Sequence, residues 1–449
     1  MSFLPSRTRT RRQLSRQRLI WLRRVATTGG AIAVGLAALA FALVADRAQT
    51  AFNDLVLRAS LAPLVLTPLA FAAIVYITRG WAPEARGSGI PQIIAAARNP
   101  GDERFRALTS MRTALYKLGL TLLGLLAGAS VGREGPTVQI GAAIMEATHR
   151  LFRIRLGAAV YIAGGAAGVS AAFNTPLAGV AFAIEELASA YEQKLALLVM
   201  AAVMISGLVS LGLAGDYLYF GGMANILSFW SNLVVCPIAG VLGGLAGGLF
   251  SRAVLRFGAS PSAVVVTARK FPIGWALACG LAVALLGIAT GGLTWGTGYD
   301  AARTLVEGGH QPLWFAPAKF AASLLTALAG LPGGIFAPSL ATGAGLGGML
   351  CPVFPSEPTG PIVLLGMIGY FTGVTRAPLT AVLIISEMTD SRAMILPLFA
   401  VALIADSVSS FVCPERIYHG LAKGFAIAPA REPPAFSPVP PSGPESRRP

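Results

Sequence analysis

The stretch GREGPTVQIGAA, residues 132–143, places Arg133 and Glu134 side by side between glycines. The residues before it, LGLTLLGLLAGASV (118–131), are almost wholly apolar, and the residues after it are nearly so. Ionisable side chains in such surroundings are costly, and they usually have a function. The first question is therefore why Arg133 and Glu134 lie between two apolar stretches.

The whole chain is unusually apolar. Of its 449 residues, 55% are hydrophobic and 12% are charged, whereas a soluble protein is about 45–50% apolar and about 25% charged. Runs such as LALLVMAAVMISGLVSLGLAG (195–215) and WALACGLAVALLGIATGG (275–292) have about the length that spans a bilayer. The short alternating segments of a transmembrane barrel are missing. The composition predicts an all-α polytopic membrane protein.

Basic residues gather at the amino-terminal end. The formal net charge is +15, and residues 1–29 hold eight arginines, from Arg7 to Arg24, and no acid. The positive-inside rule then predicts a cytoplasmic N-terminus. A secretory signal is not expected, because the polar region is long and many more apolar runs follow. The arginines lie at membrane edges, so nucleic acid is not expected as a partner.

The chain divides into four segments by composition and similarity. We expect a basic N-terminal segment at 1–29, a first membrane repeat at 30–215, a second membrane repeat at 216–427 and a disordered Pro-rich tail at 428–449.

The two repeats are predicted from one fixed offset of 202 residues. It places Gly132 on Gly334 and Pro136 on Pro338, and about fifty residues later it places Glu185 on Glu387. Repeated halves are typical of transporters and channels, whose site lies where the halves meet, at helices broken near the midplane of the bilayer.

Three turns share a pattern that suits such a site. GSGIP (87–91), GREGP (132–136) and GIFAP (334–338) each have glycine first and proline fifth. Proline fits the first turn of a helix, and that turn leaves free N–H groups and a partial positive charge, which favour anions. Amides and hydroxyls bind an anion weakly enough to let it pass. Ser88 adds a hydroxyl donor. The turns predict a transient anion site.

Glu134 is then an anion placed where anions should bind. A structural ion pair with Arg133 is one interpretation, but consecutive residues of a helix do not face each other. The alternative is a gate, in which ionised Glu134 occupies an anion position and protonation lets it leave. We favour the gate.

Glu185 and Glu186 form a second acidic pair. The simple interpretation is a cluster at a helix end near the membrane surface, which fits one of the two. Glu185 aligns with Glu387, so a shared structural role such as contact with backbone amides is expected. Glu186 aligns with Met388, and its carboxylate is therefore special to the first half, which favours a function.

Other chemistry is not expected. The four cysteines and three histidines are too scattered for a disulfide or metal site, and no cofactor is implied. GASVG (128–132) matches a hydrolase nucleophile pattern around Ser130, but an apolar helix precedes it in place of a strand, so we do not expect an enzyme. Gly240, Gly244 and Gly248 are spaced for close helix packing.

The motifs together resemble the CLC family of chloride channels and proton/chloride antiporters. The three turns are similar to its filter signatures, and AAGVSAAFNTPLAGVAFAIEEL (166–187), RAPLTAVLIISEMT (376–389) and IYHGLA (417–422) are similar to other family stretches. The resemblance covers about residues 60–422. It implies a homodimer of inverted-repeat subunits, of the prokaryotic type without regulatory nucleotide-binding domains, in the bacterial inner membrane.

The resemblance also implies roles for individual residues. Ser88 and Tyr418 would give hydroxyls to a central chloride, and the amides of Ile335 and Phe336 would hold it from the other half. Glu134 would be the outer gate and Glu186 the inner proton-transfer residue. The selectivity filter would comprise Gly87, Ser88, Gly89, Ile90, Pro91, Gly132, Arg133, Glu134, Gly135, Pro136, Gly334, Ile335, Phe336, Ala337 and Pro338.

Two details refine the expectation. Ser88 stands where fluoride exporters carry methionine and nitrate-selective relatives carry proline, which favours chloride. Gln92 stands where the family often has an acid, and we expect it only to tune the potential of the vestibule. Exchange of chloride for protons is the preferred function, and a passive chloride channel of the same fold is the alternative. The expected partners are chloride, protons, the lipid bilayer and a second copy of the chain.

Overall fold

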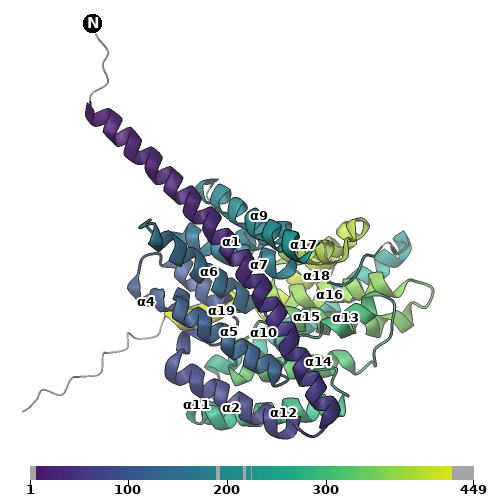
Figure 1. Ribbon diagram of the computed structural model, residues 1–449. Coiled ribbons are helices and arrows are strands. Elements are labelled where there is room, and N and C mark those ends of the chain that lie inside the picture. Colours follow the sequence, from purple (N-terminus) through teal and green to yellow (C-terminus); the bar gives the residue numbers. More distant parts are fainter. Residues whose placement is uncertain (1–6, 189–192, 216–218, 224, 427–449) are drawn as a thin grey trace, which may run out of the picture.

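The computed structural model describes residues 7–188, 193–215, 219–223 and 225–426, and these form helices joined by short turns (Figure 1). The predicted tail at 428–449 lies outside the described residues. The first half contains α1 (Arg7–Arg58), α2 (Pro63–Trp81), α3 (Ile90–Arg98), α4 (Glu103–Arg106), α5 (Met111–Leu126), α6 (Glu134–Leu151), α7 (Ala158–Phe173), α8 (Pro176–Phe182) and α9 (Gln193–Ala214).

The second half continues the series from residue 229. It contains α10 (Phe229–Ala259), α11 (Ala263–Lys270), α12 (Pro272–Ala289), α13 (Tyr299–Val306), α14 (Phe315–Ala329), α15 (Phe336–Leu350), α16 (Thr359–Thr375), α17 (Pro378–Thr389), α18 (Ile395–Val412) and α19 (Ile417–Ala426). Short helical turns connect them, including a π-helical turn at Ala183–Leu187 after α8.

The offset of 202 residues relates the helices of the two halves. The first residues of α6 and α15, of α8 and α17, and of α9 and α18 are each 202 positions apart. The turn after α7 has Asn174 in the left-handed conformation, with φ of 57°, and the turn after α16 has Arg376 with the same φ. Two corners with matching backbone angles at matching positions support a structural repeat.

Reciprocal contacts join the two halves. The amide of Gly132 donates to the carbonyl of Gly334 at 2.7 Å, and the amide of Gly334 donates back to Gly132 at 2.7 Å. Glu185 accepts hydrogen bonds from the first amides of α17, and Glu387 accepts them from the first amides of α8. In both cases a residue of the first half and its counterpart in the second half exchange roles. Two halves related by a two-fold axis produce such reciprocal contacts.

Glycines bring α10 close to its neighbours, as their spacing predicts. A Cβ on Gly244 would lie 2.7 Å from the carbonyl oxygen of Ala405 in α18, and one on Gly247 would lie 2.4 Å from the carbonyl carbon of Gly373 in α16. Gly240 and Gly248 also pack against α18. The prediction of close packing is therefore confirmed. A second row of glycines, Gly243 and Gly247, which the sequence did not single out, packs against α16.

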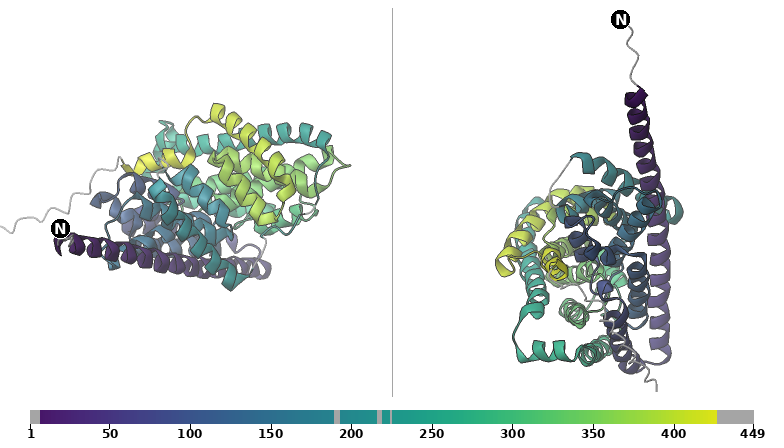
Figure 2. Two further views of the ribbon diagram at one scale, coloured as in Figure 1. Left: turned by 90° about the horizontal axis from the view of Figure 1, so that it is seen from above. Right: turned by 90° about the vertical axis from the view of Figure 1, so that its left-hand side faces the viewer.

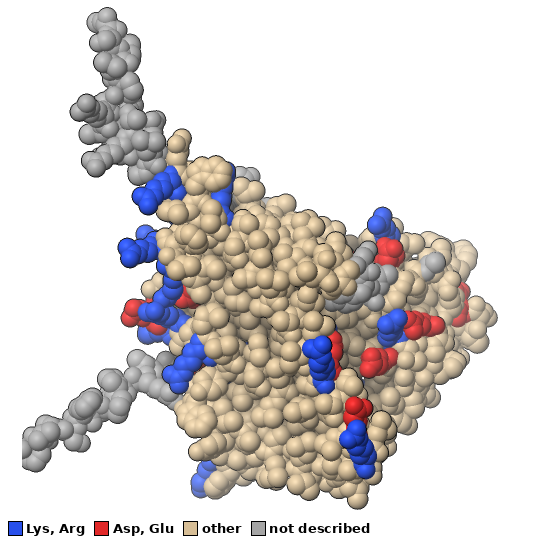
Figure 3. All heavy atoms as spheres, in the orientation of Figure 1, with Lys and Arg blue, Asp and Glu red and all other residues tan. Residues whose placement is uncertain are grey.

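The outer surface suits lipid. Among the described residues, seven helices are long and apolar enough to cross a membrane. Exposed leucines and methionines line α9, among them Leu197, Met204 and Leu208. Figure 3 shows a broad face without charged side chains in the middle of the molecule, with most Lys, Arg, Asp and Glu side chains towards its margins. An apolar surface of this extent is what a membrane-embedded protein requires.

Helix α1 runs through the expected boundary at 29/30 without a break. It has 52 residues, follows one side of the molecule and extends at its N-terminal end beyond the other helices (Figure 2). Its later part packs against α6 and α9, and it carries Asp46 to the site described next.

Candidate anion pathway at the junction of the halves

The three Gly–Pro turns meet at one place. Beyond the pair formed by Gly132 and Gly334, the amide of Gly333 donates to the carbonyl of Gly87 at 3.0 Å. Helices α3, α6 and α15 begin there, and their first residues, Ile90, Glu134 and Phe336, are buried. The structure thus brings together the motifs that the sequence predicted to converge, with three helix N-termini in the interior.

Glycine is required where the turns touch. A Cβ on Gly135 would lie 2.4 Å from Oγ of Ser88 and 3.1 Å from Cα of Gly334. A Cβ on Gly132 would lie 2.2 Å from Oε2 of Glu134. The Cβ on Gly135 would also lie 2.9 Å from the carbonyl oxygen of Ser88, which is backbone and cannot swing aside as a side chain can. The absence of a side chain at Gly135 is therefore what lets these backbones approach.

The hydroxyls of Ser88 and Tyr418 lie beside this junction. Both side chains are buried. Within the described part of the chain, neither makes a well-formed hydrogen bond. Buried hydroxyls are normally paired, so two unpaired hydroxyls beside the helix N-termini form a candidate site for an acceptor such as an anion.

Phe336 closes the same region with its ring. It contacts the rings of Phe173, Phe182, Phe371 and Tyr418, with centroid distances from 5.0 to 6.0 Å. Ile335 precedes it as the N-cap of α15. First-turn amides have no partner within their own helix, so those of Ile335 and Phe336 suit the predicted role, which stays a prediction.

Glu134 is fully buried at the first position of α6. Its Oε1 accepts a hydrogen bond of 2.7 Å from the hydroxyl of Tyr299. Its Oε2 has no hydrogen-bond partner among the residues described, and the amide of Ala337 faces the carboxylate. The carboxyl group therefore lies between the first turns of α6 and α15, where the sequence predicted an anion to bind.

Arg133 does not pair with Glu134. Its guanidinium donates to Oδ1 of Asp46 at 2.6 Å, to the carbonyl of Ala42 at 2.8 Å and to the hydroxyl of Tyr219 at 2.9 Å. These partners lie on α1 and on the segment after α9. The preference for a gate over a structural Arg133–Glu134 pair agrees with this geometry.

The acidic pair after α8 divides as its alignment predicts. Glu185 accepts from the amides of Leu379 and Thr380 at 3.2 and 2.8 Å, and Glu387 accepts from those of Leu177 and Ala178 at 3.1 and 2.9 Å. The expected contact of both glutamates with backbone amides is confirmed. A carboxylate at a helix N-terminus accepts hydrogen bonds from the free amides, and its negative charge is stabilised by the partial positive charge of the helix dipole.

Glu186 lies in the same π-helical turn but points elsewhere. It is buried, and neither carboxylate oxygen has a hydrogen-bond partner in the ranges that the structure describes. Nε2 of His419 is 3.7 Å from Oε1 of Glu186, and Nδ1 of His419 contacts the guanidinium of Arg98. Arginine only donates, so Nδ1 is the acceptor and a neutral His419 presents its N–H to Glu186.

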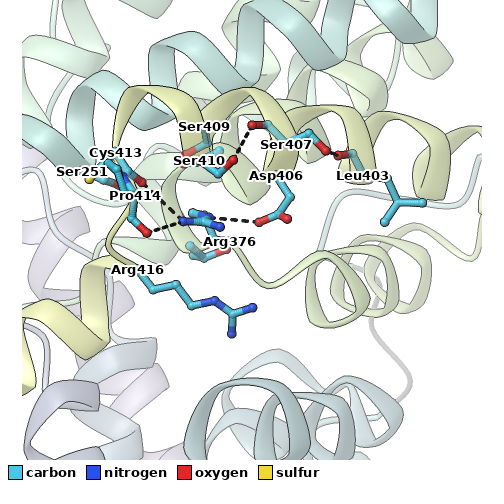
Figure 4. Close-up of polar contacts among 12 residues, drawn as sticks. Ser251, Arg376, Leu403, Asp406, Ser407, Ser409, Ser410, Cys413, Pro414 and Arg416 are labelled. Carbon is cyan, nitrogen blue, oxygen red and sulfur yellow. Dashed lines mark hydrogen bonds and ion pairs between the residues drawn. The ribbon is translucent and has the colours of Figure 1, made fainter.

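Arg376 anchors the chain that leads to Tyr418. Its guanidinium donates to Oδ1 of Asp406 at 3.1 Å and to the carbonyls of Cys413 and Pro414 at 3.4 and 2.8 Å (Figure 4). These contacts tie the corner after α16 to α18 and to the turn before α19, where Tyr418 lies. The sequence does not indicate this anchor.

We expect Arg376→Met to destabilise the protein and Arg392→Met to leave it unchanged. The Arg376 side chain is 15% exposed and its guanidinium makes three contacts, so its loss should cost about 2 kcal/mol of unfolding free energy. Arg392 pairs with Asp390 at 3.6 Å and is 89% exposed, which makes it a matched surface control. Thermal unfolding in detergent measures both, and equal midpoints for the two variants would contradict the anchor.

Two buried lysines were missed by the sequence analysis. Lys117 in α5 donates to the carbonyl of Gly87 at 2.7 Å, and Lys319 in α14 donates to that of Gly296 at 2.8 Å. Lys117 and Lys319 are 202 residues apart, so they occupy equivalent positions in the two repeats and the offset could have indicated them. Each lysine holds the loop that enters a short helix, α3 or α13.

The structure gives Gln92 a structural role that the sequence does not indicate. Gln92 is fully buried and donates to the carbonyls of Glu84 and Arg86 at 3.0 and 2.7 Å. Its amide fixes the turn before α3, and its expected effect on the potential of the vestibule stays a prediction.

Comparison with known proteins identifies the family. The model of the voltage gated chloride channel family matches residues 69–410. The chain belongs to the CLC family. It is 33% identical over 389 residues to the H(+)/Cl(-) exchange transporter ClcA of Citrobacter koseri, covering 79% of this chain and 77% of that protein. It is 33% identical over 396 residues to ClcA of Yersinia pestis, with coverage of 80% and 78%.

Solved CLC structures share the fold. A slow cyanobacterial Cl-/H+ antiporter superposes with a TM-score of 0.78 at 24% identity, covering 90% of this chain and 98% of its own. A eukaryotic CLC transporter gives a TM-score of 0.71 at 22% identity, with coverage of 90% and 74%. The fold is therefore that of a CLC membrane protein, built from two halves of tilted and interrupted helices, as the sequence predicted.

Proposed function

We propose that this CLC protein is a secondary active transporter that exchanges chloride for protons. The observation that carries the proposal is the buried carboxyl group of Glu134, placed between helix N-termini beside the hydroxyls of Ser88 and Tyr418. In that position an ionised carboxylate and a chloride ion compete for the same donors. Protonation of Glu134 then vacates a place for chloride, so the two ions move in alternation.

Glu186 would supply the proton from the other side. It is buried, it lacks hydrogen-bond partners among the described residues, and it has no counterpart in the second half, where Met388 stands. The charged groups that act on it electrostatically are Arg416, Glu185 and Arg98. The names of the bacterial relatives, which are exchange transporters, favour the same function over a passive channel.

We also propose the setting in which exchange takes place. Two copies of the chain would form a dimer in the bacterial inner membrane, each with its own pathway, because one chain supplies every residue of the candidate site. The eight arginines between Arg7 and Arg24 favour a cytoplasmic N-terminus.

Liposomes containing the purified protein test the function directly. With a chloride gradient as the only driving force and a potassium ionophore to clamp the voltage, we expect protons to move opposite to chloride and against their own gradient. A pH electrode and a chloride electrode record both fluxes in one sample. Chloride flux without proton flux would identify a passive channel, and protein-free liposomes give the leak.

A further inference from the structure

Tyr299 is the one side chain outside the predicted filter that donates a hydrogen bond to Glu134 among the described residues. Its hydroxyl lies 2.7 Å from Oε1. A hydrogen bond to a charged acceptor is stronger than a neutral one, particularly away from water. Because Tyr299 reaches the carboxylate from α13, in the second half, it is independent of the turn that carries Glu134.

Aromatic neighbours fix the position of the Tyr299 ring. It lies 5.2 Å from the ring of Tyr219 and 5.6 Å from that of Phe220, measured between centroids. The hydroxyl of Tyr219 accepts from Arg133 and donates to the carbonyl of Ala172. The Tyr299 ring therefore packs against Tyr219, whose hydroxyl is hydrogen-bonded to Arg133, the residue directly before Glu134.

The loop before Tyr299 is held from two sides. Lys319 donates to the carbonyls of Thr294 and Gly296 at 3.0 and 2.8 Å, and Gln49 of α1 accepts from the amide of Thr297 at 3.2 Å. Gly298 has φ of 83°, and a Cβ there would lie 2.7 Å from Cβ of Ala341. Because these contacts already fix the Tyr299 side chain, its hydroxyl does not lose further conformational freedom when it binds the Glu134 carboxylate.

We propose that Tyr299 is a positioning residue of the outer gate, which holds the ionised Glu134 side chain in the place that chloride would otherwise occupy. This inference rests on the proposed function. The other titratable or charged groups that act on Glu134 are Arg133, the N-cap residue directly before α6, and Tyr418 on α19. Removal of the Tyr299 hydroxyl leaves Arg133 and Tyr418 in place and removes only the hydrogen bond to the Glu134 carboxylate.

The test is the apparent chloride affinity of Tyr299→Phe in liposomes. The phenylalanine keeps the ring and its packing. Because an ionised Glu134 that is held less firmly competes less with chloride, the KM for chloride should fall by about tenfold at neutral pH. The difference should shrink as the pH is lowered, since a protonated Glu134 no longer competes.

Two controls make the result specific. Tyr161→Phe also removes a buried phenol hydroxyl beside a glutamate, Glu146, but on α7, away from the three converging turns, and should leave the KM unchanged. Tyr299→Phe in a Glu134→Ala background should have no effect, because the group that it positions is gone.

The outcomes separate this inference from the proposed function. An unchanged KM in Tyr299→Phe, or a shift that persists in the Glu134→Ala background, would overturn the role of Tyr299. A wild-type protein that moves chloride without protons would overturn exchange, while the KM comparison would still report on Tyr299.

Discussion

Glu134→Ala should reduce proton movement to the level of protein-free liposomes while chloride continues to pass. The carboxyl group of Glu134 lies where the three helix N-termini meet, and alanine can neither carry a proton nor occupy an anion position. The expected effect is complete, because the other acidic side chain that the structure describes beside these turns, Asp46, is held in an ion pair by Arg133, whereas Oε2 of Glu134 has no hydrogen-bond partner among the described residues. Simultaneous chloride and pH recordings measure it.

Glu146→Gln is the matched control for that variant. Glu146 is also buried on α6, but it pairs with Arg150 at 2.6 Å and contacts Thr109, far along the helix from the converging turns. Its replacement should leave the ratio of protons to chloride unchanged. If Glu134→Ala still accumulates chloride when only a proton gradient drives it, the assignment of the outer gate is wrong.

Glu186→Gln should also abolish proton coupling, from the other end of the route. Glutamine has nearly the shape of glutamate and cannot release a proton, so the packing of the π-helical turn is kept while proton transfer stops. Chloride should still move, since Glu186 is absent from the candidate anion site. The ratio of proton to chloride flux is the quantity to measure.

Glu387→Gln separates this effect from a general loss of structure. Glu387 caps α8, so its replacement should lower stability by about 1 kcal/mol and leave coupling intact. If Glu186→Gln transports protons at the wild-type ratio, the inner proton-transfer role is wrong, whatever the fate of Glu134.

The sequence predicted the parts of the site that have a local pattern. Glycine and proline four positions apart indicate a helix that starts abruptly, and all three such turns meet in the structure. The repeat offset predicted that Glu185 and Glu387 have a shared role, and both contact backbone amides. These predictions succeeded because the physical cause, a helix N-terminus with free amides, lies within a few residues of its sequence signal.

The partners of the charged residues could not be predicted in this way. Asp46 is 87 positions from Arg133, and Tyr299 is 165 positions from Glu134. A single aspartate or tyrosine at the end of an apolar run carries no periodicity that marks it. Only packing of α1 and α13 beside the filter turns brings them into contact, and packing is a property of the whole fold.

The exchanged carboxylate caps have a consequence for biosynthesis. Helix α8 cannot satisfy its first amides until Glu387 has left the ribosome, about two hundred residues later. A fragment ending before α10 would leave the first amides of α8 and the carboxylate of Glu185 without the partners that they have in the complete fold. Each half thus supplies a helix cap that the other lacks, and both caps can form only after most of the second half has been synthesised.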